Sequence, residues 1–457
     1  MLAPLALLIV LAAASQTPAD CCPGPENETG TLAVGLPGAR VVECAKRAEA
    51  LGFRGAVLAA LDGEVVAAVG VGSADLAGEV PNTPATLFEL ASASKQFTAA
   101  AVLALAQDKK LKLDDPISKH LRGVPRDCAK ITVRHLLQHT SGIPRTNSSG
   151  GGDDLEPVLP LFLEGGPRHE PGTHFEYWNQ GYALLSAIVE KAAREPFVDY
   201  SRERLFERAK LKVTRFTGDP APEDAVVAVG RSAKGAPRSA LAHPYGSFGY
   251  QYRGMGGVVT SVWDLWRWDR ALKGDELLKD AAKRELFDPG LEDYALGWYV
   301  HRRPDGRVVQ EHGGAVRGFV CQVRRYPKDD GCLFVLCNRD DFDSSGLADL
   351  LERALFDAAF VMPPKRLASE RAAALVGTWR TDAGRSLEIA LDAEGVARAT
   401  LRWGPEEGAP VTRGTLGQDG DETVFFTAGE SLPLRLERDR KSNRIVALEL
   451  SDQTFRR

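Results

Sequence analysis

Three short motifs in this chain combine the residue types that acyl transfer needs. They are residues 92–95 (Ser-Ala-Ser-Lys), residues 177–179 (Tyr-Trp-Asn) and residues 312–315 (His-Gly-Gly-Ala). A serine hydroxyl becomes a useful nucleophile only when a base accepts its proton, and an acyl transition state needs N–H donors for its oxyanion. In this order the motifs could supply a nucleophile, a base system and an oxyanion site.

The first motif predicts the nucleophile and its base. Ser92 opens a helical pattern over residues 92–106, so its oxygen is expected near a helix N-terminus. Lys95 stands one turn away on the same helical face. Its amine can accept the serine proton only if burial or a neighbouring cation lowers its pKa. An isolated pair of this kind would more often be a capping serine and a solvated lysine.

The second motif supplies a phenol and an amide. Tyr177 and Asn179 follow a Pro-Gly turn at residues 171–172 and are expected on a loop that enters a helix near Gly181. A phenol can relay a proton to or from the nucleophile, and the Asn179 amide can hold both Lys95 and a substrate carbonyl. Taken alone, the pair would more readily be a buried tyrosine and a turn asparagine.

The third motif ends a predicted strand. Gly313 and Gly314 would let the backbone approach a ligand closely. The N–H groups of Ala315 and Ser92 could then form an oxyanion hole, in which each donor contributes about 3 kcal/mol or more. His312 would provide a hydrogen bond and, when protonated, a charge. Alone, this motif would be a glycine-rich strand end with a surface histidine.

The elements that must position these motifs are an early hairpin, a run of helices and a late run of strands. The hairpin spans residues 53–71 around Asp62-Gly63. Helical patterns cover residues 131–138 and 182–194, strand patterns begin at Tyr294, and an amphipathic helix closes the segment at residues 347–360. We therefore expect an antiparallel sheet whose two halves come from opposite ends of this segment.

The C-terminal part has a different pattern. After a Pro-Pro break at residues 363–364, about eight short alternating segments separated by turn residues fill residues 368–457. This spacing is typical of a small barrel or sandwich. We predict a separate all-β barrel domain there, following a hydrolase domain of residues 39–362.

The N-terminus predicts export. Residues 2–14 are apolar without interruption and too short to span a bilayer, so residues 1–19 are interpreted as a signal peptide and residues 20–38 as a linker. The expected location is the periplasm or the exterior, with no stable membrane span. The segment lacks a basic start, so a short anchor or a frayed apolar terminus is the alternative.

The seven cysteines include no Cys-x-x-Cys pair, so neither a zinc site nor a redox motif is expected. In an exported protein, Cys21 or Cys22 could bridge Cys44. Cys321 and Cys337 are expected roughly opposite one another in a hairpin. We interpret them as buried strand residues rather than as a bridged pair.

Charge and composition narrow the partners. The formal charge of −5 is spread along the chain without a basic run, which argues against nucleic acid. No metal-binding motif is found, and His135 and His139, four apart on a helix, are interpreted as structural, so no metal and no cofactor are expected. The predicted partner is a small molecule or a short peptide.

Together the motifs resemble those of the serine β-lactamase and penicillin-binding protein superfamily, specifically its class C β-lactamase-related branch. Residues 136–143, 256–264 and 296–298 also resemble that branch, and the resemblance spans roughly residues 40–360. It implies an α+β fold: a five-stranded antiparallel sheet flanked by helices, an adjoining helical region, and the site at their boundary. It also implies the roles already argued for the three motifs. The C-terminal domain resembles the lipocalin-like barrels appended to D-aminopeptidase-type members.

One departure from the pattern bears on the substrate. Efficient β-lactamases usually begin the third motif with lysine, whereas this chain has His312. In this respect it resembles the esterase, D-aminopeptidase and peptidase members more than the drug-hydrolysing enzymes. We predict a serine hydrolase that forms an acyl-enzyme on Ser92 and cleaves esters or amides, with D-amino-acid peptides and β-lactams among the candidates. The alternative is a catalytically weak penicillin-binding, scaffold or regulatory member of the same fold.

Overall fold

The computed structural model describes residues 28–145, 152–232, 235–360, 362–392, 395–406, 408–419, 421–427, 430–439 and 441–457. The expected signal peptide, residues 1–19, lies outside the described residues, as do Cys21 and Cys22 with their expected bridge. Within the described part, no helix is both long and apolar enough to cross a membrane.

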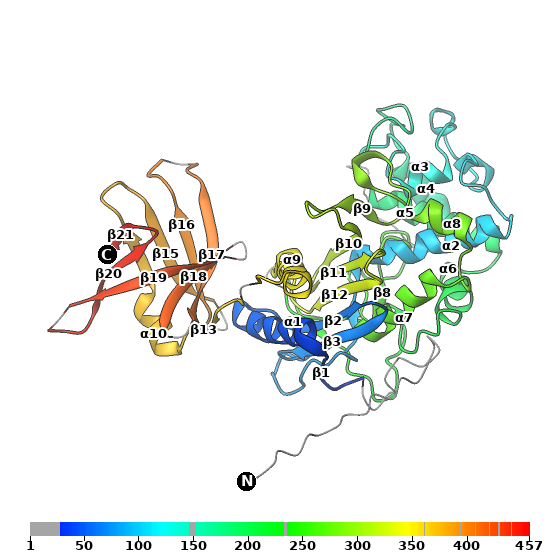
Figure 1. The fold of residues 1–457 in the computed structure, drawn as a ribbon. Helices are drawn as coiled ribbons and strands as arrows, with labels where there is room; N and C mark the ends of the chain where they lie inside the picture. The colour runs from blue at the N-terminus through cyan, green and yellow to red at the C-terminus, as the bar shows by residue number, and fades with distance from the viewer. Residues whose placement is uncertain are drawn as a thin grey trace, which may run out of the picture.

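A central antiparallel sheet is formed by both ends of the first 360 residues, as the sequence predicts (Figure 1). In spatial order its strands are β1 (Leu32–Ala33), β3 (Glu64–Val71), β2 (Gly55–Leu61), β12 (Gly331–Cys337), β11 (Phe319–Tyr326), β10 (Val308–Val316) and β9 (Tyr299–Arg302). The β2–β12 pair joins the early hairpin to the late strands. The sheet has seven strands where the resemblance implied five. β9 falls in the strand pattern that begins at Tyr294, whereas the two-residue edge strand β1 was not expected.

Helices cover both faces of the sheet (Figure 1). One face is covered by α1 (Gly35–Ala48) and α9 (Ser344–Phe356), which pack on each other and on β3, β11 and β12. Against the other face lies α7 (Val262–Lys273), and the helical region extends beyond it. This arrangement confirms the predicted α+β class and places the helical region beside the sheet.

A single buried helix organises the helical region. It is α2 (Lys95–Gln107), eleven of whose residues, from Lys95 to Leu105, are buried. Its partners are α5 (Asn179–Ala193), α6 (Phe197–Ser201) and α8 (Asp280–Leu286). A helix that is apolar on all sides is stable only when neighbours surround it, so the start of α2 is held firmly between these helices and the sheet.

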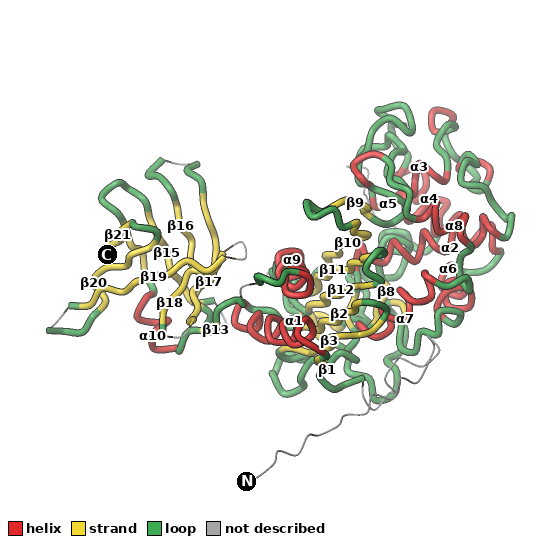
Figure 2. The backbone as a smooth tube through the Cα atoms, in the orientation of Figure 1, coloured by secondary structure: helices red, strands yellow, loops and turns green. Residues whose placement is uncertain are grey.

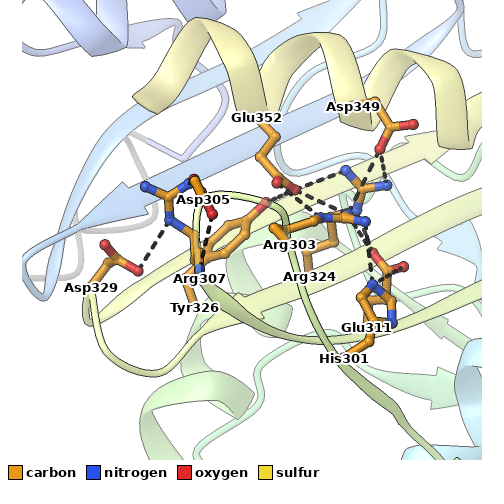
Figure 3. Close-up of polar contacts among 10 residues, drawn as sticks. All are labelled: His301, Arg303, Asp305, Arg307, Glu311, Arg324, Tyr326, Asp329, Asp349 and Glu352. Atoms are coloured by element: carbon orange, nitrogen blue, oxygen red, sulfur yellow. Dashed lines mark hydrogen bonds and ion pairs between the residues drawn. The ribbon is translucent and has the colours of Figure 1, made fainter. Parts of the chain in front are cut away.

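A charged network fixes α9 to the back of β11 (Figure 3). Arg324 is 1% exposed and pairs with Glu311 (2.6 Å), Asp349 (2.7 Å) and Glu352 (3.0 Å). The Tyr326 hydroxyl also donates to Glu352, at 2.8 Å. These charges satisfy one another, so they join the helix to the sheet without an unpaired ion.

The C-terminal part is a closed eight-stranded barrel, which confirms the prediction (Figure 2). Its strands are β14 (Gly377–Arg380), β15 (Ser386–Leu391), β16 (Ala397–Arg402), β17 (Val411–Asp419), β18 (Glu422–Thr427), β19 (Glu430–Arg438), β20 (Ile445–Leu450) and β21 (Gln453–Arg456). Pairing of β17 with β18 closes the ring. The barrel contacts the first part of the chain through Arg398, which donates to the Leu51 carbonyl at 2.5 Å.

The described cysteines are buried, free thiols, namely Cys44, Cys128, Cys321, Cys332 and Cys337. Cys321 and Cys337 are buried strand residues, as predicted. Burial raises the pKa of the Cys44 thiol to about 12, so it is unreactive at neutral pH.

Candidate active site

Ser92 lies in a tight turn directly before α2. The turn is η3 (Ala91–Ser94), a 3-10 helix where the sequence predicted the first turn of an α-helix. Ala91 has a φ of 46°, in the left-handed region that a residue with a side chain adopts only at a cost in free energy. The nucleophile candidate therefore follows a strained residue that its surroundings must hold in place.

Lys95 is buried beside this turn, 0% exposed. Its Nζ donates to Asn179 Oδ1 at 2.8 Å and to the Met255 carbonyl at 3.1 Å, and lies 4.9 Å from the centre of the Tyr177 ring. Burial lowers the pKa of Lys95 well below 10.5, and no described carboxylate opposes it. The two acceptors leave one tetrahedral position on the nitrogen, where a neutral amine carries its lone pair.

Tyr177 and Asn179 come from the start of α5. The helix begins at Asn179, two residues earlier than expected, so Asn179 lies in its first turn and Tyr177 lies directly before the N-cap residue Trp178. Burial raises the pKa of the Tyr177 phenol, and the neighbouring Ser92 hydroxyl acts in the opposite direction. Among the described residues, the phenol oxygen has no hydrogen-bond partner of regular geometry. Tyr177 is thus a neutral phenol beside both Ser92 and Lys95.

The third motif forms the end of β10, which packs against η3. At Gly314, an added Cβ would lie 2.1 Å from the Leu90 carbonyl oxygen and 2.9 Å from Cys321 Sγ. Only glycine allows this approach. At Gly313, an added Cβ would meet only the end of the Gln322 side chain, at 2.6 Å. The motif therefore needs its second glycine to bring β10 against the turn that carries Ser92.

The open edge of β10 lies beside this contact. Pairing with β9 ends where Glu311 meets Tyr299, so no described strand pairs with that edge from His312 to Val316. Ala315 is exposed there. The backbone groups on this edge of β10 therefore have no strand partner among the described residues.

His312 is buried rather than open to a ligand, at 3% exposure. Its Nδ1 lies 2.6 Å from the Gly313 carbonyl, and its Nε2 lies 3.2 Å from the Tyr294 hydroxyl. Nδ1 must therefore carry the proton and Nε2 must accept from Tyr294. Burial lowers the pKa of His312 to about 3, with a smaller contribution from Lys95 when that amine is protonated. The side chain is neutral at pH 7 and both nitrogens are already used.

His139 was assigned a structural role from the sequence, and it lies directly beneath Tyr177. It is 2% exposed, its ring centre is 4.2 Å from that of Tyr177, and its Nδ1 accepts from the Trp178 N–H at 3.2 Å. Its Nε2 has no partner among the described residues. Burial lowers its pKa well below 6.5, helped by Lys95 and His312. In the sequence, His139 lies in segment 136–143, which resembles the family. The spacing of that segment did not indicate that the His139 ring would contact Tyr177.

The Met255 carbonyl is the other group that the motifs did not reveal. A backbone acceptor has no side-chain signature, and only the Gly-Gly pair at residues 256–257 marked this segment. Within the described ranges, no group of three or more His, Cys, Asp or Glu residues could hold a metal ion.

Comparison with known proteins identifies the family of this chain. The family model described as Beta-lactamase matches residues 43–358, which is well over half of the 457 residues. The chain belongs to the beta-lactamase family. Members of this family are serine acyl-transferases or hydrolases that act on small substrates.

Individual relatives extend the comparison. This beta-lactamase family member is 30% identical to Penicillin-binding protein 4* of Bacillus subtilis over 339 residues, 68% of this chain and 74% of that protein. Its fold is similar to that of an octameric penicillin-binding protein homologue from Pyrococcus abyssi, with a TM-score of 0.59, 21% identity and coverage of 88% and 95%. It also resembles the D-amino acid amidase from Ochrobactrum anthropi SV3, with a TM-score of 0.60, 23% identity and coverage of 70% and 98%.

Proposed function

We propose that this chain is a serine hydrolase that forms an acyl-enzyme on Ser92 and cleaves esters or amides. The observation that carries the proposal is the buried Lys95 amine, which has no carboxylate partner among the described residues and a lowered pKa. Burial without a counter-charge favours the neutral amine, which is the form that can accept a proton. A purely structural lysine would be expected to snorkel or to form an ion pair.

The proton path follows from the three groups. As the Ser92 oxygen attacks the substrate carbonyl, its proton passes to Lys95, directly or through the neutral Tyr177 phenol. The oxyanion that forms is held by the N–H groups of Ser92 and Ala315. When the intermediate collapses, the same proton goes to the leaving alcohol or amine. Water then repeats the sequence on the acyl-enzyme and releases the acid.

We propose that neutral esters and amides are better substrates than β-lactams. A substrate carboxylate gains little from His312, which is neutral and engaged with Tyr294 and Gly313. Arg317, exposed one residue beyond β10, is the cation nearest along the chain to that motif. The amidase and penicillin-binding relatives suggest D-phenylalanine amide and benzylpenicillin as test substrates beside a p-nitrophenyl ester.

The first test is covalent labelling. The wild type is treated with a fluorophosphonate, and the modified peptide is identified by mass spectrometry, with Ser92→Ala as the control. We expect a single adduct on Ser92 and none in the variant. A labelled residue elsewhere would contradict the assignment. A benzylpenicillin adduct without ester turnover would instead favour the weak penicillin-binding alternative.

The second test concerns specificity. We compare kcat/KM for a cephalosporin and for a short p-nitrophenyl ester in the wild type and in His312→Lys. The wild type should prefer the ester, and the variant should shift the ratio toward the cephalosporin by about tenfold to a hundredfold, since one charged contact contributes about 1.5–3 kcal/mol. Cephalosporin turnover by the wild type near the diffusional ceiling would show that the preference is wrong.

A further inference from the structure

A buried acid lies three residues before the nucleophile. Glu89 ends β4 (Phe88–Glu89) and is 1% exposed. Its carboxylate accepts hydrogen bonds from the Arg238 guanidinium and from the Tyr252 hydroxyl. Burial raises the pKa of Glu89, and the Arg238 cation acts against this. No step of the proposed mechanism uses this group, so its position needs another explanation.

Arg238 connects Glu89 to the oxyanion strand. Its Nη2 donates to Glu89 and also to the Arg317 carbonyl at 2.9 Å, two residues beyond Ala315. Its guanidinium lies 5.1 Å from the centre of the Phe319 ring, at the start of β11. A planar guanidinium can hold several acceptors at fixed angles, which a lysine cannot do. The residue thus ties β4 to the turn between β10 and β11.

Tyr252 connects the same carboxylate to the segment that holds Lys95. Its ring packs directly on the backbone of Gly256, where an added Cβ would lie 2.3 Å from a ring carbon. The preceding residue, Met255, supplies the carbonyl that accepts from Lys95 Nζ at 3.1 Å. Through Glu89, the nucleophile turn, the lysine acceptor and the oxyanion strand therefore share one buried anchor.

The turn that this anchor holds is strained. Ala91 lies between Glu89 and Ser92 with a φ of 46°, a conformation that persists only when the surrounding contacts impose it. On its other side, Gly314 brings β10 against the Leu90 carbonyl. Buried ion pairs are often no more stabilising than apolar residues of the same size, so stability alone is a weak reason for charges here.

We propose that Glu89 and Arg238 are positioning residues that hold the N–H groups of Ser92 and Ala315 in register and thereby set the rate of acylation. This inference rests on the function proposed above. Loss of the pair should slow acylation without weakening substrate binding, because only the transition state requires the two N–H groups to converge.

The test uses the full chain with Glu89→Gln/Arg238→Met, which removes both charges together and leaves an amide oxygen for Tyr252. We expect kcat for p-nitrophenyl acetate and the fluorophosphonate labelling rate at Ser92 to fall about 100-fold, as for a misplacement of roughly 1 Å, with KM within about threefold. Arg238→Lys keeps the charge but reaches only one acceptor at a time, so we expect a loss of about tenfold in kcat.

Arg324→Met is the matched control, because it removes an equally buried arginine from the opposite face of the sheet (Figure 3). It should lower the melting temperature but leave kcat unchanged. Wild-type kcat and labelling rate in either the double variant or Arg238→Lys would overturn the positioning role, as would an equal loss of kcat in Arg324→Met. Absence of a Ser92 adduct in the wild type would instead overturn the proposed function, and this inference with it.

Discussion

Strands β10 and β11 present opposite chemistry on their two faces. On the back face, Glu311 and Arg324 face each other in register and join α9 through a network of paired charges (Figure 3). On the site face, the next residue, His312, lies near the Tyr177 phenol and His139 Nε2, and neither of these makes a hydrogen bond of regular geometry with a described residue.

The difference teaches which polar groups stabilise this fold. Buried polar atoms in a protein are nearly always hydrogen-bonded, and an unsatisfied one costs about 1–3 kcal/mol. On the back face the charged groups pair with one another as ions, although Gln322 Oε1 there also has no hydrogen-bond partner among the described residues. The site face leaves it unmet at the Tyr177 phenol and at His139 Nε2. Variants on the two faces should therefore separate activity from stability.

The largest effect is expected for the nucleophile and its base. Ser92→Ala should lower kcat for ester hydrolysis by about 10⁴-fold or more with little change in the free energy of unfolding, and Lys95→Ala should cost nearly as much. The double variant should be only slightly worse than either single one, because the two groups act as a unit. Multiplicative losses, or comparable turnover by Ser92→Ala, would refute their assignment.

The two glycines of the third motif offer a test within one strand. Gly314→Ala places a Cβ 2.1 Å from the Leu90 carbonyl on the site face, so the nucleophile turn must move, and we expect kcat to fall about 100-fold or more. Gly313→Ala meets only the flexible end of Gln322 on the back face. That side chain can change rotamer, so kcat should stay within about threefold. Equal losses in the two variants would argue against the close approach as the cause.

A pair of tyrosines separates the two faces more finely. Tyr177→Phe removes the hydroxyl proposed to relay the Ser92 proton, so it should lower kcat about 100-fold. Because that buried oxygen makes no hydrogen bond of regular geometry with a described residue, the free energy of unfolding should stay the same or rise slightly. Tyr326→Phe removes the hydroxyl that donates to Glu352 at 2.8 Å. It should lower the free energy of unfolding by about 1–3 kcal/mol and leave kcat unchanged. Denaturant titrations and ester kinetics on both variants measure the two effects. A loss of stability in Tyr177→Phe together with a loss of kcat in Tyr326→Phe would contradict this division.

The buried His312 should make the protein sensitive to acid. Its pKa of about 3 in the folded chain lies below the ordinary value of 6.5, so between these values the unfolded chain binds the extra proton. The free energy of unfolding should therefore fall as the pH falls from 7 to 5, by about 2 kcal/mol for this group. His312→Gln lacks this titration, and its smaller dependence can be measured by urea unfolding at both pH values. Identical pH dependences would show that His312 is not held neutral.

The smallest effect is expected for removal of the barrel. We propose that a chain ending at residue 362 folds by itself, since the sheet and α9 are complete by Phe356. Turnover of a small ester should remain within about twofold, because the site residues end at Ala315 and none lies in the barrel. Removal exposes the side chains that surround Phe426, which packs on the α1–α9 side of the sheet. Insolubility of the shortened chain would show instead that the two parts share a core.

Local patterns in the sequence predicted much of this molecule. The β2–β3 hairpin, α2, the paired late strands and the barrel strands follow from turn residues and hydrophobic periods that extend over only a few positions. The three motifs were found in the same way, since their residue types are themselves the signal. Short edge strands such as β1 were missed, because two residues carry no period.

Tertiary structure decided the state of the groups that the sequence could only name. The lowered pKa of Lys95 follows from burial, and its acceptor Met255 is 160 residues away along the chain. His312 is neutral because packing encloses it with Tyr294, and Gly314 is required because β10 meets Leu90. Desolvation and close contact arise between distant segments, so residue type and spacing could not reveal them.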